Sequence, residues 1–96
     1  MVLDDRKYVN DCYDLLMELE IIDSKYQFSE QFLGQCKNYY GVMLSENRRP
    51  TNNMLYNLSE KMEQLSECFT EPQFKQLAED GQQILMSRFD KYLSRK

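Results

Sequence analysis

The sequence predicts an all-α fold: a compact bundle of about five helices that contains a helix-turn-helix and ends in a longer C-terminal helix. The 96 residues include only three glycines and two prolines, so little of the chain is marked as turn. No stretch alternates β-branched and polar residues as strands do, whereas apolar residues recur three and four positions apart. Because no linker or low-complexity tract divides the chain, residues 1–96 are expected to form a single helical domain.

The first helix is expected to begin after a cap at Asp4 or Asp5 and to run to about Ile22. An apolar stripe predicts which of its faces is buried. This stripe consists of Tyr8, Val9, Cys12, Leu15, Leu16 and Leu19. The polar pair Asp23-Ser24 then interrupts the pattern, so the helix is expected to end before it.

Two short helices are expected next, over residues 27–33 and 37–45, with Ser24 as a possible cap for the first of them. Gly34 lies between them and supplies the positive φ that a tight turn between helices often needs. On the second short helix, the residues able to face inward are Tyr40, Met43 and Leu44. Of the two adjacent tyrosines in this helix, we expect Tyr40 to be the buried one.

The fourth helix is expected to start at Pro50-Thr51, after a loop over residues 47–49, because the residue before a proline is held in extended geometry. Its buried face is predicted to consist of Met54, Leu55, Leu58, Met62 and Leu65. The helix-turn-helix core is therefore expected to occupy residues 24–65.

The last helix is expected over residues 71–93, because Thr70-Glu71-Pro72 combines a capping hydroxyl, an acid and a proline near the first turn. Its stripe comprises Phe74, Leu77, Ala78, Gly81, Leu85, Arg88, Phe89 and Tyr92. A glycine costs a helix interior roughly 1 kcal/mol relative to alanine. We therefore expect another helix to approach closely at Gly81.

Composition argues against several classes of function. The chain has no histidine, and its carboxylate pairs, such as Asp11 and Asp14, have only the spacing of a helix surface. The sequence therefore predicts no enzyme, no catalytic residue, no metal site and no cofactor. The three cysteines are far apart in the sequence and are expected to be reduced thiols. No long apolar run indicates a signal peptide or a membrane partner, so a cytoplasmic location is expected.

The charges are distributed unevenly along the chain, whose net charge is −4. Residues 1–23 carry seven acids and two bases, whereas residues 24–57 carry two acids and four bases, and residues 58–96 are nearly balanced. The one positive segment therefore coincides with the predicted helix-turn-helix. A basic segment within an otherwise acidic chain is a charge distribution that a sequence-specific DNA-binding protein would show.

The residues of this segment also form a recognisable pattern. The pattern comprises Phe28-Ser29, Phe32-Leu33-Gly34, Tyr39-Tyr40 and Arg48-Arg49-Pro50-Thr51, followed by Leu55, Leu58, Ser59 and Met62. It resembles the phage-repressor (Cro-like) helix-turn-helix superfamily, and is most similar to small bacterial and phage members. Leu33 is one residue more than the common spacing before the glycine. The resemblance implies a sequence-specific DNA-binding transcriptional regulator of phage or mobile-element character.

The resemblance further implies that the third helix enters the major groove of DNA with its first residues against the bases. Asn38 can pair with adenine, Lys37 can donate to guanine, and Val42 can touch a thymine methyl. Residues near the starts of the second and fourth helices are expected to contact phosphates. The candidate DNA-binding residues are Lys25, Gln27, Gln35, Lys37, Asn38, Tyr39, Val42, Arg48, Arg49, Asn52 and Asn53.

A DNA reader of this size is expected to act as a homodimer, because symmetric operators double a small interface. The candidate dimerisation residues lie on the last helix: Leu85, Phe89, Tyr92 and Leu93. The alternative is a protein-interaction module of the antagonist or anti-repressor type, on a helix-turn-helix scaffold that no longer binds DNA. It would engage a partner through the acidic first helix or the apolar last helix. The isoelectric point near 4.8 and the acids Glu30 and Glu46 favour this alternative.

Overall fold

The computed structural model describes the backbone of residues 4–93 and the side chains of residues 4–89. The elements are α1 (Asp5–Glu18), α2 (Lys25–Gln27) continued by a π-helical turn η1 (Phe28–Phe32), α3 (Tyr39–Ser45), α4 (Asn52–Cys68) and α5 (Pro72–Leu93). No strand occurs in this part of the chain. The predicted all-α bundle with a longer last helix is therefore confirmed.

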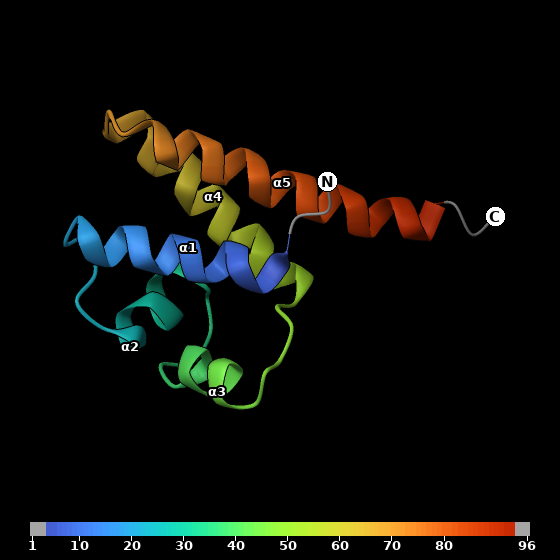
Figure 1. Ribbon diagram of the computed structural model, residues 1–96, viewed down its shortest axis with the longest axis horizontal. Helices are drawn as coiled ribbons and strands as arrows, with labels where there is room; N and C mark the ends of the chain where they lie inside the picture. Colours follow the sequence, from blue (N-terminus) through green and yellow to red (C-terminus); the bar gives the residue numbers. More distant parts are fainter. Residues whose placement is uncertain (1–3, 94–96) are drawn as a thin grey trace.

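The helices are arranged on two sides of α1 (Figure 1). α5 lies on one side, α2 and α3 lie on the other, and α4 crosses behind α1 and contacts both α5 and η1. At its C-terminal end, α5 runs past the other helices and projects from the bundle. No helix within residues 4–93 has both the length and the apolar character that are needed to span a bilayer.

The core is built from apolar residues that every helix except the short α2 contributes. Its buried members are Tyr8, Val9, Cys12, Leu16, Ile22, Phe28, Phe32, Leu33, Tyr40, Met43, Met54, Leu55, Leu58, Met62, Phe74, Ala78, Ile84 and Leu85. The predicted stripes are largely confirmed by this set. The expectation that Leu44 faces inward is wrong, since its side chain is 41% exposed. The buried face of α3 is centred on Tyr40 and Met43, so Leu44 falls at its edge.

Three helices start at side-chain caps that can be recognised in the sequence. Asp4 accepts the Arg6 N–H at 2.9 Å for α1, Ser24 accepts the Gln27 N–H at 3.2 Å for α2, and Thr51 accepts the Met54 N–H at 3.2 Å for α4. Each side chain satisfies a backbone donor that the first turn of a helix leaves unpaired. The caps at Ser24 and Thr51 confirm the predicted starts, although α2 begins at Lys25 rather than at residue 27.

Two helices end at left-handed residues that are not glycine. α1 ends at Glu18, short of the expected Ile22, because Glu20 has φ 60° and the Ile21 N–H turns back to the Leu16 carbonyl at 2.9 Å. α3 ends at Ser45 in the same way, because Asn47 has φ 53° and the Arg48 N–H turns back to the Met43 carbonyl at 3.0 Å. This Schellman arrangement usually uses glycine, because other residues pay about 1–2 kcal/mol in that region.

The π-helical turn η1 accounts for the extra residue before Gly34. Its defining hydrogen bond runs from the Leu33 N–H to the Phe28 carbonyl at 3.1 Å, five residues back. A bond over five residues instead of four accommodates one additional residue in a helix. As a result, both Phe32 and the adjacent Leu33 reach the core, although neighbouring positions on a regular α-helix point in different directions.

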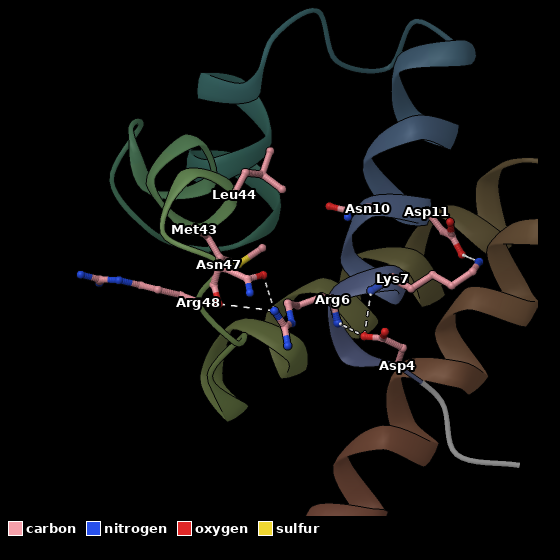
Figure 2. Close-up of a pocket in the computed structure, with 9 residues that line it drawn as sticks. All are labelled: Asp4, Arg6, Lys7, Asn10, Asp11, Met43, Leu44, Asn47 and Arg48. Carbon is pink, nitrogen blue, oxygen red and sulfur yellow. Dashed lines mark hydrogen bonds and ion pairs between the residues drawn. The ribbon is translucent and has the colours of Figure 1, made fainter.

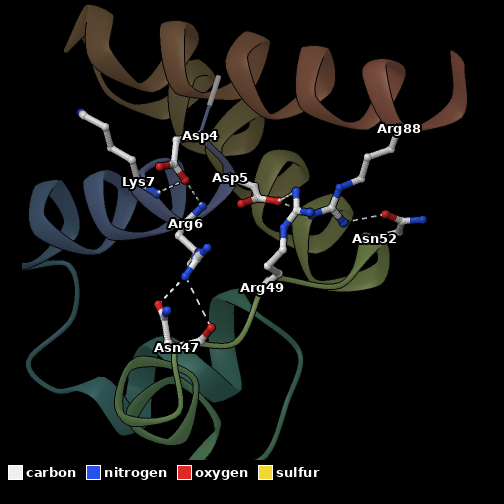
Figure 3. Close-up of polar contacts among 8 residues, drawn as sticks. All are labelled: Asp4, Asp5, Arg6, Lys7, Asn47, Arg49, Asn52 and Arg88. Carbon is white, nitrogen blue, oxygen red and sulfur yellow. Dashed lines mark hydrogen bonds and ion pairs between the residues drawn. The ribbon is translucent and has the colours of Figure 1, made fainter. Parts of the chain in front are cut away.

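A buried carboxylate joins the two ends of the chain (Figure 3). Asp5 accepts a hydrogen bond from Arg49 at 2.9 Å and one from Arg88 at 2.5 Å. Arg88 also donates to the Asn52 side chain at 2.7 Å. We call these four residues the Asp5 cluster. It connects α1, the loop before α4, the first turn of α4, and α5.

The two arginines keep Asp5 ionised. Burial alone would raise the pKa of Asp5, but the hydrogen bonds and charges of Arg88 and Arg49 outweigh it and hold the pKa below the ordinary value of 3.8. Asp5 therefore binds its proton more weakly in the folded protein than in the unfolded chain. Its contribution to stability is complete above that value and is lost as the pH falls through the lower pKa of the folded state.

Gly81 lies where α5 meets both α1 and α4. A Cβ atom at this position would lie 2.7 Å from the Ser59 Cβ and would overlap the Tyr8 hydroxyl. The predicted close approach is confirmed. The Tyr8 hydroxyl is buried there and has no hydrogen-bond partner among the described residues, so this junction is fixed by packing alone.

We predict that Gly81→Ala destabilises the protein by about 1–3 kcal/mol, because the overlap outweighs the gain in helix propensity. The matched control is Gly41→Ala in α3, where an added Cβ meets nothing within 4 Å. This control should gain about 0.5–1 kcal/mol. Chemical denaturation of both variants measures the difference, and equal effects at the two positions would contradict the close packing at Gly81.

We predict that Asp5→Asn lowers the free energy of unfolding by about 2 kcal/mol, because it leaves the partly buried Arg88 without its carboxylate. The control Asp11→Asn removes an exposed pair with Lys7 and should change stability by less than about 1 kcal/mol. Urea denaturation from pH 7 to pH 3 should show wild-type stability falling below about pH 4. The difference between wild type and Asp5→Asn should shrink over that range, and a constant difference would count against the ion pairs.

Candidate nucleic-acid interface

The second and third helices and the turn between them form a unit at one edge of the bundle (Figure 1). We call residues 25–45 the α2–α3 unit. Its turn spans residues 33–38, and Gly34 has φ +66° as the sequence predicts. Asn57 of α4 supports this turn, since its amide donates to the Leu33 carbonyl at 3.4 Å. The same amide nitrogen would lie only 2.6 Å from a Cβ at Gly34.

Ser29 caps the start of α3 from η1. Its hydroxyl accepts the Tyr40 backbone N–H at 3.0 Å and donates to the Lys25 carbonyl at 3.0 Å. Such a bond satisfies one of the donors that the first turn of α3 leaves unpaired. Asn38, the residue immediately before α3, makes no capping bond with its side chain. The exposed Asn38 amide is therefore available to a partner.

Tyr40 orients α3 against α1. Its ring lies 4.9 Å from the Phe28 ring and 4.9 Å from the Tyr13 ring, and its hydroxyl donates to the Asn10 side chain at 2.6 Å. Tyr40 is buried as predicted, and the neighbouring tyrosine is only half-buried. With this face of α3 held in the core, Val42 on another face is 37% exposed.

The start of α3 lies two residues later than expected. α3 begins at Tyr39, because the Tyr39 N–H closes a turn to the Cys36 carbonyl at 3.0 Å. Lys37 and Asn38 therefore belong to the turn before the helix and not to its first turn. Both side chains are exposed.

Two lysines on the surface of the α2–α3 unit, Lys25 and Lys37, have no carboxylate within ion-pair distance among the described side chains. The Lys37 ammonium lies 5.8 Å from the centre of the Tyr26 ring. Cation–π attraction at an exposed site of this kind is worth about 0.5–1 kcal/mol. Tyr26 is not among the site residues predicted from the sequence. Tyr26 and Lys37 are eleven positions apart, and only the turn between α2 and α3 brings them together.

Other predicted DNA-binding residues bond within the protein. The pairs are Gln27 with the Asp23 N–H at 2.7 Å, Arg48 with Glu46 at 2.7 Å, Arg49 with Asp5 at 2.9 Å, and Asn52 with Arg88 at 2.7 Å. The pair of Arg48 is exposed on both sides, so it is worth less than about 1 kcal/mol. Arg49 is 68% exposed despite its partner. Gln35 is half-buried, and Asn53 is exposed.

A polar cleft of about 630 Å³ separates the start of α1 from the end of α3 (Figure 2). Arg6 of α1 crosses it and donates to both the side chain and the backbone carbonyl of Asn47. This contact holds the left-handed end of α3 against α1. The Arg48 guanidinium points away from α1 (Figure 2), so it faces solvent beside α3.

The predicted dimerisation residues have different surroundings. Leu85 is buried in the core of its own chain, because α5 lies along α4 as far as the contact between Arg88 and Asn52. Leu85 therefore has no surface for a partner, which corrects its expected role. Phe89 is 53% exposed. The side chains of Tyr92 and Leu93 lie outside the described residues.

No group of three metal-binding side chains is found in the described part of the chain. Its cysteines are free thiols: Cys12 is buried, whereas Cys36 and Cys68 are exposed. Burial raises the pKa of the Cys12 thiol, which keeps it protonated and unreactive.

These features define a small all-α protein with a short helix, α3, at one edge of the bundle and with exposed polar side chains in the turn before that helix. Residues 9–93 match the family of unknown function DUF6626, so the chain belongs to that family. No curated protein matches the chain, and no solved structure matches it either. The role of the α2–α3 unit must therefore be inferred from its own residues.

We predict that Ser29→Ala destabilises the protein by about 1–2 kcal/mol, because the buried Tyr40 N–H loses its acceptor. Hydrogen exchange should show faster exchange at the Tyr40 amide than in the wild type. Ser45→Ala is the matched control, since the Ser45 hydroxyl only donates to a carbonyl of its own helix. Unchanged protection of Tyr40 in Ser29→Ala would refute the cap.

Proposed function

We propose that this protein is a sequence-specific DNA-binding transcriptional regulator of the helix-turn-helix type, which acts in the cytoplasm as a homodimer. The observation that carries the proposal is the exposed pair Lys37 and Asn38 in the turn immediately before α3, a helix whose inner face is anchored in the core. A reading helix needs this combination, because base edges are recognised by side chains that a rigid scaffold holds in position.

The side-chain chemistry at the start of α3 suits base edges. An asparagine amide can donate and accept at once, and it pairs bidentately with adenine. Asn38 is available for such contacts because Ser29 caps the helix in its place. Lys37 supplies a donor for guanine, and the exposed methyl groups of Val42 suit a thymine methyl. The resemblance of this segment to phage repressors supports the same role and favours a regulator of phage or mobile-element character.

Exposed cations on both sides of α3 suit the phosphate backbone. Lys25 precedes the helix in the α2–α3 unit, and Arg48 follows it with its guanidinium in solvent. Arg49 is held by Asp5 but keeps most of its surface. A protein with few such contacts binds DNA weakly as a single copy, which favours a dimer on a symmetric operator.

A protein-interaction module is the second candidate function. Two of the four cations in the positive segment, Arg48 and Arg49, already pair with carboxylates of the same chain. Val42 and Leu44 are exposed apolar residues on α3. A surface whose arginine charges are partly neutralised by carboxylates, and which lies beside exposed apolar residues, suits a protein partner better than it suits DNA.

A selection from random double-stranded DNA, at about 50 mM and 200 mM salt with sequencing of the retained fraction, tests the first proposal. We expect a palindromic site and a steep loss of binding with salt. Lys37→Ala and Asn38→Ala should each weaken binding to that site by about tenfold or more and relax its preference. Arg48→Ala should weaken all sequences similarly and reduce the salt slope by about 0.9.

The matched control is Lys75→Ala, which removes the same charge from an exposed position on α5 and should leave binding unchanged. Arg49→Ala is avoided because it also disrupts the Asp5 cluster. If the chain retains no DNA at the lower salt, the DNA proposal is rejected. A partner protein whose binding is lost in Val42→Asp would then support the second candidate.

A further inference from the structure

An apolar groove lies between α1 and the start of α5, outside the α2–α3 unit. Its volume is about 210 Å³, and its lining consists of Asp11, Leu15, Gln73, Gln76 and Leu77. Leu15 and Leu77 are both half-buried, so each presents apolar surface to the groove. The groove has room for one large apolar side chain and is bounded by polar groups. A small apolar slot with a polar rim is typical of a site that takes an anchoring side chain.

The α1 side of this groove is acidic. Asp11 lines it, and Glu18 is exposed one turn beyond Leu15 on the same helix. On α5, Gln76 donates to Asp80 at 2.9 Å. Lys7 pairs with Asp11 at 2.8 Å, and Lys75 is exposed beside Gln76 on α5. The pair of Lys7 and Asp11 is exposed, at 72% and 46% for its side chains, and such pairs are worth less than about 1 kcal/mol, so a second cation can compete for Asp11.

The other end of α5 has the complementary chemistry. Residues 89–96 contain three cations and one acid, together with Phe89, Tyr92 and Leu93. This end of α5 projects beyond the other helices (Figure 1), and Phe89 is 53% exposed. The chain therefore carries a basic, apolar segment at one end of α5 and an acidic, apolar groove at the other.

The segment cannot reach the groove of its own chain. Leu77 and Leu93 lie sixteen positions apart on one helix, which separates them by about 24 Å. The three residues after Leu93 span at most about 10 Å when fully extended. Occupation of the groove by this segment therefore requires a second copy.

We propose that two copies associate reciprocally, each placing residues 89–96, which comprise the end of its α5 and the three residues after it, into the α1–α5 groove of the other. The exchange is isologous and closes as a two-fold dimer, because each copy both donates a segment and accepts one. One apolar side chain fills the slot between Leu15 and Leu77, and the terminal cations face Asp11 and Glu18. This inference rests on the homodimer of the proposed function and does not depend on DNA binding.

Sedimentation equilibrium of the full chain without DNA tests the proposal through charge reversal on both sides. Arg95→Glu/Lys96→Glu alters the segment, and Asp11→Lys/Glu18→Lys alters the groove. Each double variant should weaken dimerisation by about tenfold or more, because two symmetric contacts become repulsive. The variant that carries all four changes should recover most of the wild-type association. The control Glu60→Lys/Glu63→Lys, exposed on α4, should associate as the wild type does.

Restoration by the fourfold variant would support the reciprocal contact, since a folding defect would accumulate rather than cancel. A dimer that survives both double variants would overturn the groove as the acceptor while leaving the proposed homodimer intact. A wild-type chain that stays monomeric at every concentration would overturn this contact and the homodimer together. The DNA selection is made with the wild-type chain and read through Lys37 and Asn38, so it is scored separately from these dimerisation variants.

Discussion

The ionised carboxylate of Asp5 is the constraint on which the arrangement of the helices depends. A buried charge is tolerated only when other charges and hydrogen bonds surround it. The required guanidiniums come from Arg49, just before α4, and from Arg88, late in α5. Satisfying this one group therefore positions α1 against the α4–α5 hairpin and sets the path of the loop that leaves α3. The α2–α3 unit is attached to that framework through Tyr40, which bonds Asn10 of α1, and through Asn57 of α4.

Where the sequence predicted the fold well, the responsible signal was local. Helix starts were found because a capping side chain stands within a few residues of the donor it satisfies, as Ser24 and Thr51 do. Helix ends were found less well, because the left-handed residues at Glu20 and Asn47 lack the glycine that normally marks such an end. The extra residue at Leu33 was visible in the sequence, but only the structure shows that a π-helical turn accommodates it.

The candidate site depends more strongly on contacts between distant parts of the chain. Periodicity was sufficient to predict that Tyr40 is buried, and the same helix leaves Val42 in solvent. Periodicity could not show that Arg49 is shared with Asp5, 44 positions away, or that Ser29 caps α3 in place of Asn38. These partnerships change the chemistry available to the residues. The bond to Asp5 occupies part of the Arg49 guanidinium, which is then less available to a partner. The cap by Ser29 leaves the Asn38 amide available. The site therefore differs in detail from its prediction.

The π-helical turn also makes the α2–α3 unit sensitive to chain length. Each residue of an α-helix advances by about 100° around its axis. Loss of a single codon within residues 28–32 would convert the turn to regular helix and rotate α2 by about that angle relative to Gly34 and α3. Tyr26 would then lose its cation–π contact with Lys37, while the core residues after Gly34 stayed in place. Relatives that differ in length by one residue here would thus present a different surface beside α3, even with identical side chains on α3 itself.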